Sequence, residues 1–294
     1  MVGGDGNAAA LARTADRLPP RAGSHVSDIL ARRFSALQRL SERELGLLRT
    51  IGNYRERHFT DDELVAQGAV AHRPQFIRSG WACRRRVLAD GRRQILSFLL
   101  PGDPIGLSPR LEPELSDIVA LTPVETIDAR PVLVAAQSGS APGLVRALRL
   151  MDRNERRLLL DQVVRLGRQS AYERTAHLLI ELQQRLQVVG LGDRERFPLP
   201  VNQEVLADAL GLSIVHVNRT LQQLRRERLI ELRAGVAVLL NPQRLAEIAD
   251  YPLDQAPTAA ATSRAQPGGV VVAQPVQGGR IVGHAIQSVQ PAFR

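Results

Sequence analysis

The residues best suited to chemistry lie between Gln203 and Ile230, where hydrogen-bonding side chains recur on one side of a predicted helix. Val217, Leu221 and Leu224 are spaced by four and three residues and therefore share a buried face. At about 100° per residue, Val215, Arg219 and Gln222 point the opposite way, with His216 and Asn218 on the flanks. Arginine, asparagine and glutamine bind base edges in the major groove, so this face predicts sequence-specific binding to double-stranded DNA.

A shorter helix and a tight turn must position this recognition helix. Leu206, Ala209 and Leu210 form the apolar face of the first helix. Gly211 tolerates a left-handed backbone, and Ser213 can cap the second helix. Helix, turn and helix in this order place the second helix in a DNA groove. A helical hairpin within another kind of domain is the alternative interpretation.

Further polar residues are candidates for contacts with DNA phosphates. Asn202, Gln203 and Ser213 lie near helix starts, where backbone N–H groups favour an anion. Arg225 and Arg226 follow at the end of the second helix, as backbone contacts or as solvated charges. The predicted DNA-binding residues are Asn202, Gln203, Ser213, Val215, His216, Asn218, Arg219 and Arg225.

The stretch LADALGLSIVHVNRTLQQLRRERLI resembles the winged-helix region of the Crp/Fnr superfamily of bacterial transcription regulators. Alternating apolar residues follow the turn Arg233-Ala234-Gly235, as expected for a two-stranded wing. The resemblance implies that Arg219 contacts a guanine of the half-site. It departs at Ile214 and Val215, where several members carry Arg-Glu. Val215 can contact a thymine methyl but cannot accept a hydrogen bond from cytosine N4. We therefore expect a DNA half-site that differs from that of the best-known family members.

The resemblance extends upstream to about residue 27 and implies an α+β fold. Its parts are an N-terminal β-roll or jelly-roll sensor domain, a long dimerisation helix and a C-terminal winged helix-turn-helix domain. Ala89-Asp90-Gly91 between two apolar runs predicts a hairpin in the roll, and Ser41 with Glu44 predicts a capping box. The expected boundaries are a disordered N-terminus over 1–24, the roll over 25–140, the dimerisation helix over 141–168, the winged domain over 169–251 and a disordered tail over 252–294.

The predicted long helix carries an apolar stripe. The stripe consists of Leu144, Leu148, Met151, Leu159, Val163 and Leu166. Glu155 and Gln162 interrupt it, and we expect these polar residues to fix the register of two copies across a twofold axis. Docking of the stripe on the roll of its own chain is the alternative.

The sensor region departs from the nucleotide-binding members that it resembles. In those members a Gly-Glu pair holds the ribose and an arginine holds the cyclic phosphate. Here residues 107–122 lack a second Gly-Glu, and Glu114 falls about where the arginine is expected, with Arg110 before it. Because a carboxylate repels a phosphate, we expect regulation without cyclic AMP, and the effector is unknown.

Cysteine and histidine usage limits the cofactor chemistry. The 294 residues include one cysteine, Cys83, which excludes disulfides within the chain and Cys-clustered zinc or iron–sulfur sites. His58, His72 and Cys83 have the chemistry of axial haem ligands, although ordinary surface or strand positions also explain them. Arginines next to Cys83 could stabilise its thiolate. We predict no cofactor, no metal and, since no catalytic motif is evident, no enzyme.

Charge and hydropathy limit the kinds of partner that the chain is expected to bind. The net charge is +9 and every basic residue is arginine, but residues 201–251 hold six arginines against six acidic residues. This neutral balance leaves a second interpretation, a ligand-binding sensor whose C-terminal helical domain docks a protein partner. No apolar run of 18 residues occurs, so we expect a cytoplasmic protein without a membrane partner. The expected partners are double-stranded DNA, a second copy of the chain and RNA polymerase.

Overall fold

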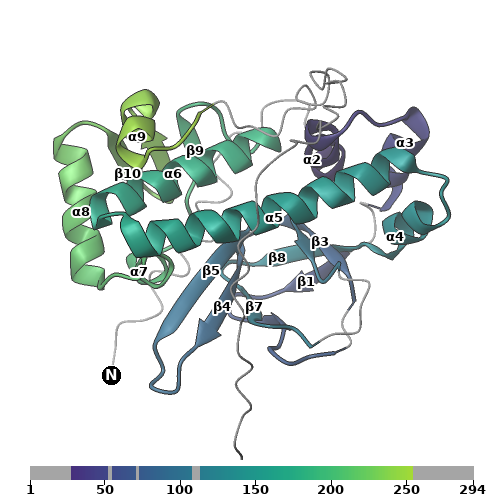
Figure 1. Cartoon of the computed structure of the whole chain (residues 1–294), viewed down its shortest axis with the longest axis horizontal. Coiled ribbons are helices and arrows are strands. Elements are labelled where there is room, and N and C mark those ends of the chain that lie inside the picture. The colour runs from purple at the N-terminus through teal and green to yellow at the C-terminus, as the bar shows by residue number, and fades with distance from the viewer. Residues whose placement is uncertain (1–27, 52–54, 71–72, 108–112, 254–294) are drawn as a thin grey trace, which may run out of the picture. The chain divides into compact units, whose positions relative to one another are not determined.

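The computed structural model describes residues 28–51, 55–70, 73–107 and 113–253 (Figure 1). The ends predicted to be disordered lie outside these residues, apart from residues 252 and 253. The described chain has the predicted α+β fold, with an N-terminal β-roll, a long helix and a C-terminal helical domain carrying a small sheet. None of the described helices is both long and apolar enough to cross a membrane.

Two antiparallel four-stranded sheets form the β-roll. Their strand orders are β1-β8-β3-β6 and β2-β7-β4-β5. Buried side chains from both sheets, including Ile77, Ile105 and Ile118, form the core of the roll. The strands are β1 (Arg55–His58), β2 (Glu63–Val65), β3 (Gln75–Ser79), β4 (Ala82–Val87), β5 (Arg93–Leu99), β6 (Pro104–Ile105), β7 (Asp117–Ala120) and β8 (Val124–Asp128).

The predicted hairpin joins β4 to β5. The strands pair from Ala82 with Leu99 to Val87 with Arg93, and Gly91 in the turn has a φ of 84°. Such a positive φ favours glycine. The hairpin brings the start of β5 beside the C-terminal domain, where β5 contacts helix α7.

Three short helices, α2 (Ile29–Leu37), α3 (Glu42–Ile51) and α4 (Arg130–Gln137), pack beside the roll and the long helix. The predicted capping box starts α3. The N–H of Ser41 donates to Glu44 Oε2 at 2.8 Å, and the N–H of Glu44 donates to Ser41 Oγ at 3.3 Å. Glu44 also accepts from the N–H of Leu144 at 3.1 Å, so it holds the start of the long helix as well.

The long helix α5 spans Pro142–Arg168 and runs beside the roll (Figure 1). Some of its apolar residues are buried within the chain and others are exposed to solvent. Leu144 and Met151 of the predicted stripe are buried within the chain, whereas Val163 is exposed. The helix therefore docks on its own chain and still presents apolar side chains to solvent.

The two polar residues of the predicted stripe make contacts within one chain. Arg84 donates to Glu155 at 2.9 Å, and the Gln162 amide donates to the carbonyl of Ala209 at 2.8 Å. Gln162 is also buried. Gln162 is therefore used within one chain, whereas the side chain of Glu155 stays 35% exposed, so the expectation that these residues fix the register of two copies stays a prediction.

The C-terminal domain packs three helices and a three-stranded sheet against α6 (Ala171–Val188). Ser170 and Glu173 form a capping box at the start of α6. Leu178, Phe197 and Leu221 lie in the shared core. The other elements are β9 (Arg196–Pro198), α7 (Gln203–Leu210), α8 (Ile214–Arg226), β10 (Ile230–Arg233), β11 (Val236–Leu239) and α9 (Pro242–Ala249).

Candidate nucleic-acid interface

Both helices of the predicted helix-turn-helix begin at a capping side chain. Asn202 Oδ1 accepts from the N–H of Val205 at 2.9 Å, and Ser213 Oγ accepts from the N–H of His216 at 3.2 Å. Between them Gly211 ends α7 with a φ of 63°. These caps satisfy N–H groups that have no partner inside a helix, and they fix the direction in which α8 leaves the turn.

Helix α8 has one buried and one exposed face, as its sequence predicts. Val217, Leu221 and Leu224 are buried together with Thr220. Val215 is 71% exposed although it is apolar. The other residues of the exposed face are His216, Asn218, Arg219 and Gln222. Ile214 at the start of the helix is 49% exposed, so the helix presents two apolar and several polar side chains to a partner.

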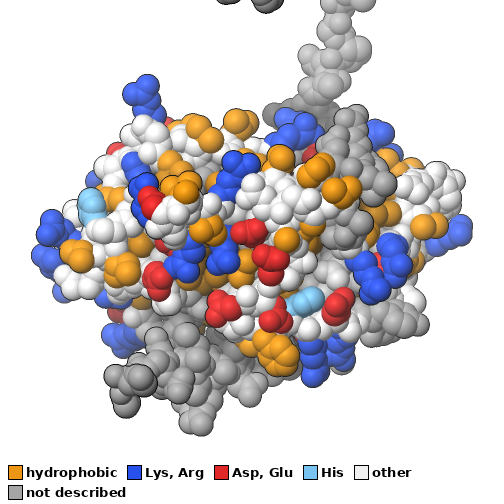
Figure 2. Space-filling view, turned by 90° about the horizontal axis from the view of Figure 1, so that it is seen from below, with side chains coloured by type: hydrophobic (Ala, Val, Ile, Leu, Met, Phe, Trp, Pro, Cys, Tyr) orange, Lys and Arg blue, Asp and Glu red, His pale blue; other side chains and the backbone are white. Residues whose placement is uncertain are grey.

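The polar side chains of this face are unused within the chain. Among the residues that the structure describes, Asn218, Arg219 and Gln222 have no side-chain hydrogen bond or ion pair. Basic side chains project at the left-hand end of the molecule in Figure 2, where Figure 1 places α8. Donors held on a rigid helix without internal partners can bind base edges and phosphates.

A groove beside α8 brings together three of the predicted phosphate-contact residues. Asn202 and Gln203 line it from the start of α7, and Arg225 lines it from α8. Its other side is the turn of the wing, Arg233-Ala234-Gly235. The N-terminus of α7 and two arginines therefore border one groove, an arrangement that favours an anion.

Arg233 is a candidate that the sequence analysis did not select. It is the last residue of β10, and the positive φ values of Ala234 (47°) and Gly235 (74°) turn the chain into β11. Its Nε lies 3.5 Å from Glu231 Oε2, and the Arg233 side chain is 83% exposed. The sequence feature that could have identified Arg233 is its position directly before the predicted wing turn.

The end of α8 is fixed by a contact with α6. The hydroxyl of Tyr172 donates to the Glu227 carboxylate, which also accepts from Gln223 at 3.0 Å. Burial and this hydrogen bond raise the pKa of Tyr172 to about 12, so the hydroxyl remains a donor at neutral pH. The contact restrains α8 relative to α6.

Of the candidate cofactor ligands, the structure describes His58 and Cys83. Within the described ranges, no group of three or more His, Cys, Asp or Glu side chains could hold a metal ion. Burial raises the pKa of Cys83 to about 12, so its thiolate is not formed at neutral pH, contrary to the effect suggested by the nearby arginines. The His58 ring lies 3.2 Å from Thr126 Oγ1, and His72 lies outside the described residues.

A second groove lies between the roll and α5, lined mainly by apolar side chains with Arg84 and Arg86 at its wall. Arg84 lies 3.6 Å from Glu114 and 2.9 Å from Glu155. Two carboxylates therefore surround this guanidinium, and little of its charge is available to an anionic ligand, whereas Arg86 and Arg149 line the groove without an ion pair among the described residues. Arg110 lies outside the described residues.

Comparison with known proteins adds to this geometry. Residues 173–248 match the family of Crp-like helix-turn-helix domains, and residues 56–130 match the family of cyclic nucleotide-binding domains. The first match contains α7, α8 and the wing, and the second contains most of the β-roll.

Individual relatives cover both regions. The chain is 31% identical over 230 residues to the nitrogen fixation regulation protein FixK of Bradyrhizobium diazoefficiens, covering 77% of this chain and 94% of that protein. It is 31% identical over 194 residues to the transcriptional activatory protein AadR of Rhodopseudomonas palustris, covering 66% and 80%. The solved structure of FixK2 from Bradyrhizobium japonicum superposes with a TM-score of 0.58 at 28% identity, covering 66% of this chain and 96% of that chain.

Proposed function

The chain belongs to the Crp/Fnr family of DNA-binding transcription regulators, and we propose that it binds a palindromic DNA site as a homodimer through α8. The exposed face of α8 carries this proposal. Asn218, Arg219 and Gln222 have no partner among the described residues, and the buried face and the caps hold them on a rigid helix. Such an arrangement suits direct reading of bases in the major groove.

The individual roles follow from position and chemistry. Arg219 donates to a guanine, and Val215 contacts a thymine methyl. His216 and Asn218 are further readers of base edges. Asn202, Gln203, Ser213 and Arg225 contact phosphates, supported by the groove that three of them line and by the helix start that Ser213 caps.

Exposed apolar residues on α5 support the homodimer. Leu160, Val163 and Val164 are 66%, 68% and 55% exposed, although all three are large and apolar. Contiguous apolar side chains of this kind favour burial against a partner. Two copies that join along α5 present two recognition helices to half-sites about one helical turn apart.

The sensor groove supports regulation without cyclic AMP. Of the three arginines that line the groove, Arg86 and Arg149 are exposed, and the less exposed Arg84, the one best placed to hold a phosphate inside the groove, already pairs with Glu114 and Glu155. Binding would leave a carboxylate beside the phosphate and would also desolvate it. The groove is retained in the fold, but its charges do not favour this ligand.

A regulatory rather than catalytic role completes the proposal. Such a protein acts where its DNA lies, in the cytoplasm, and affects transcription through RNA polymerase bound at the same promoter. The sequence-level alternative, docking of a protein partner on the helical domain, is tested by the same experiment as DNA binding.

The test is selection of bound sequences from a random pool of DNA duplexes by the purified full-length protein, at near-physiological salt and without added ligand. We expect a palindromic motif, and a light-scattering mass of two chains. Enrichment only after addition of cyclic AMP would contradict the proposal that the protein binds DNA without this ligand. No enrichment in any of the selections, without ligand or with cyclic AMP, cyclic GMP or haem added, would contradict the DNA-binding function and favour a protein partner.

A further inference from the structure

The last turn of α7 is held by side chains from three other elements. Carbonyl groups at the end of a helix have no partner inside it, so they need donors from elsewhere. The carbonyls of Asp208, Ala209 and Leu210 accept, in that order, from Gln94 of β5 at 2.9 Å, Gln162 of α5 at 2.8 Å and Arg174 of α6 at 3.1 Å. The helix that precedes the recognition helix is therefore bound directly to the β-roll.

Arg93, the first residue of β5, adds a charged contact to the same helix. Its guanidinium pairs with Glu204, and its Nε lies 2.9 Å from Asp208 Oδ2. Glu204 and Asp208 are four residues apart and therefore share one side of α7. The Asp208 side chain is only 20% exposed, so this contact is partly shielded from solvent.

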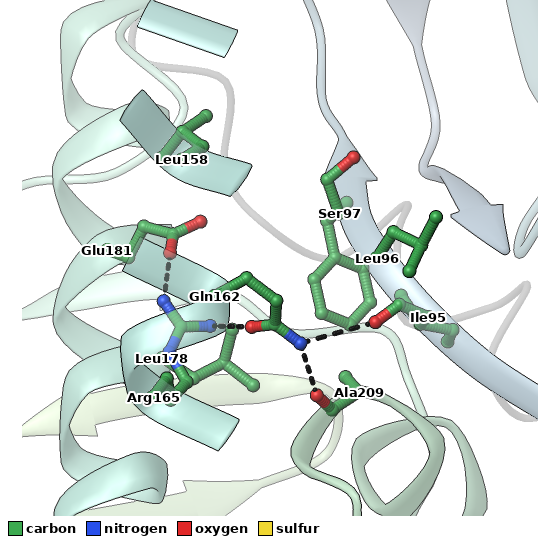
Figure 3. Close-up of a pocket in the computed structure, with 10 residues that line it drawn as sticks. Ile95, Leu96, Ser97, Leu158, Gln162, Arg165, Leu178, Glu181 and Ala209 are labelled. Carbon is green, nitrogen blue, oxygen red and sulfur yellow. Dashed lines mark hydrogen bonds and ion pairs between the residues drawn. The ribbon is translucent and has the colours of Figure 1, made fainter. Parts of the chain in front are cut away.

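A buried chain of charges supports the neighbouring contact of Gln162. Figure 3 shows Gln162 between Ile95, Ala209 and Arg165, with Arg165 reaching Glu181. The pairs continue from Glu181 through Arg185 and Asp103 to Arg33, and no side chain in these ion pairs is more than 9% exposed. Breaking such a buried network costs much free energy, so the network holds the side chain of Gln162 in place. We call the contact of α7 with Arg93, Gln94 and Gln162 the joint, and Arg93 lies at its more exposed edge.

We propose that Arg93 is a positioning residue that sets the half-site spacing accepted by the dimer. This inference rests on the proposed function. Helix α7 packs on α8, so the position of α7 on β5 determines the direction of the recognition helix relative to the roll. In a dimer joined along α5, that direction sets the separation of the two recognition helices. Successive base pairs are about 3.4 Å apart and rotated by roughly 35° about the DNA axis, so a change of that size in the separation and orientation of the recognition helices changes the preferred spacing by one base pair.

The test compares the selected palindrome with duplexes whose half-sites are moved one or two base pairs closer together or further apart. Full-length wild type is expected to bind the selected spacing about tenfold more tightly than the shifted ones. In Arg93→Glu this ratio is expected to fall below about threefold, because two attractive pairs become repulsive. Arg92→Glu is the matched control. It makes the same charge change one residue away, where Arg92 pairs with Asp90 in the hairpin turn, and keeps the wild-type ratio.

A charge swap separates positioning from a general loss of structure. Arg93→Glu combined with Glu204→Arg and Asp208→Arg restores both pairs with reversed signs and is expected to recover the spacing ratio. An unchanged ratio in Arg93→Glu overturns the inference. So does a swap variant whose ratio stays as low as that of Arg93→Glu.

A distance measurement tests the same joint without DNA. Spin labels at Leu88→Cys, near the hairpin tip, and Gln222→Cys, on α8, are both on exposed positions, whereas Cys83 is buried. Wild type is expected to give a narrow distance distribution, Arg93→Glu a broader or displaced one, and the swap a narrow one again. An unchanged distribution in Arg93→Glu overturns the inference. Absence of any palindrome in the wild-type selection would instead contradict the proposed function.

Discussion

The side-chain amide of Gln162 lies 2.8 Å from the carbonyl oxygen of Ala209, so the long helix α5 directly holds the last turn of α7. The same amide lies 3.3 Å from the carbonyl of Ile95, which belongs to β5 (Figure 3). One buried glutamine therefore joins the β-roll, the long helix and the helix-turn-helix. The orientation of the recognition helix depends on this joint as much as on the turn that precedes it.

Removal of the Gln162 amide is expected to destabilise the protein. Gln162→Leu leaves the Ala209 carbonyl without this donor and the Arg165 guanidinium without this acceptor, both in a buried site. The free energy of unfolding, measured by urea denaturation, is expected to fall by about 1–3 kcal/mol. The control is Gln222→Leu on the exposed face of α8, where the amide has no partner among the described residues, with an expected change within about 0.5 kcal/mol. Equal losses for the two variants would contradict the role given to Gln162.

Gly211 is expected to resist substitution for two physical reasons. Its φ of 63° is unfavourable for residues with a side chain, and an added Cβ would lie 3.1 Å from Leu166 Cδ2. Gly211→Ala is therefore expected to lower the free energy of unfolding by about 1–2 kcal/mol. Gly46→Ala, inside α3 with open space around it, is expected to stabilise the protein by about 0.5–1 kcal/mol. Unfolding curves in which both variants shift in the same direction would refute this explanation.

His177 makes stability dependent on pH. It is buried against Tyr251, with ring centroids 4.9 Å apart, and among the described residues neither of its ring nitrogens has a hydrogen-bond partner. Burial, and then the nearby Arg165, lowers its pKa to about 4 from an ordinary 6.5. The unfolded chain therefore takes up the proton first, and stability is lost as pH falls from about 6.5 towards 4.

The loss from this histidine is expected to be roughly 2 kcal/mol between pH 7 and pH 5. His177→Phe keeps an aromatic ring beside Tyr251 without the titration, so its unfolding free energy is expected to fall less over this range. The same slope in wild type and His177→Phe would show that other groups cause the pH dependence.

Cys83 is expected to be inert in the folded protein. It is 1% exposed, and burial raises its pKa to about 12, so neither access nor thiolate is available at neutral pH. Alkylation by iodoacetamide, followed by mass spectrometry, is expected to be slow in the native protein and fast in urea. Gln222→Cys provides an exposed thiol for comparison. Equally rapid modification of Cys83 in the native protein would contradict its burial.

The parts of the fold that depend on local pattern could be predicted from the sequence. The faces of α8 follow from spacings of three and four residues, and the cap at Ser213 and the turn at Gly211 follow from side-chain and backbone chemistry. The β4–β5 hairpin follows from Asp90-Gly91 between apolar runs. In each case neighbours along the chain decide the structure.

The joint between the roll and α7 could not be predicted in this way. Arg93 and Glu204 are 111 residues apart, and no periodic pattern marks either as a partner of the other. Gln162 reads as an interruption of a dimer stripe, because one helix face looks alike whether it meets a second copy or the same chain. Only the three-dimensional arrangement shows that its amide is used within the chain.

The most direct test of DNA reading by α8 is the affinity of Arg219→Ala for the selected palindrome and for random duplexes of the same length. We expect a loss of about 1–3 kcal/mol on the palindrome, a relaxed preference at one base pair of each half-site and little change on random DNA. Arg225→Ala, in the groove beside α8 and proposed to contact a phosphate, is expected to weaken both duplexes alike. Equal losses on palindromic and random DNA for Arg219→Ala would contradict the claim that this helix reads the sequence.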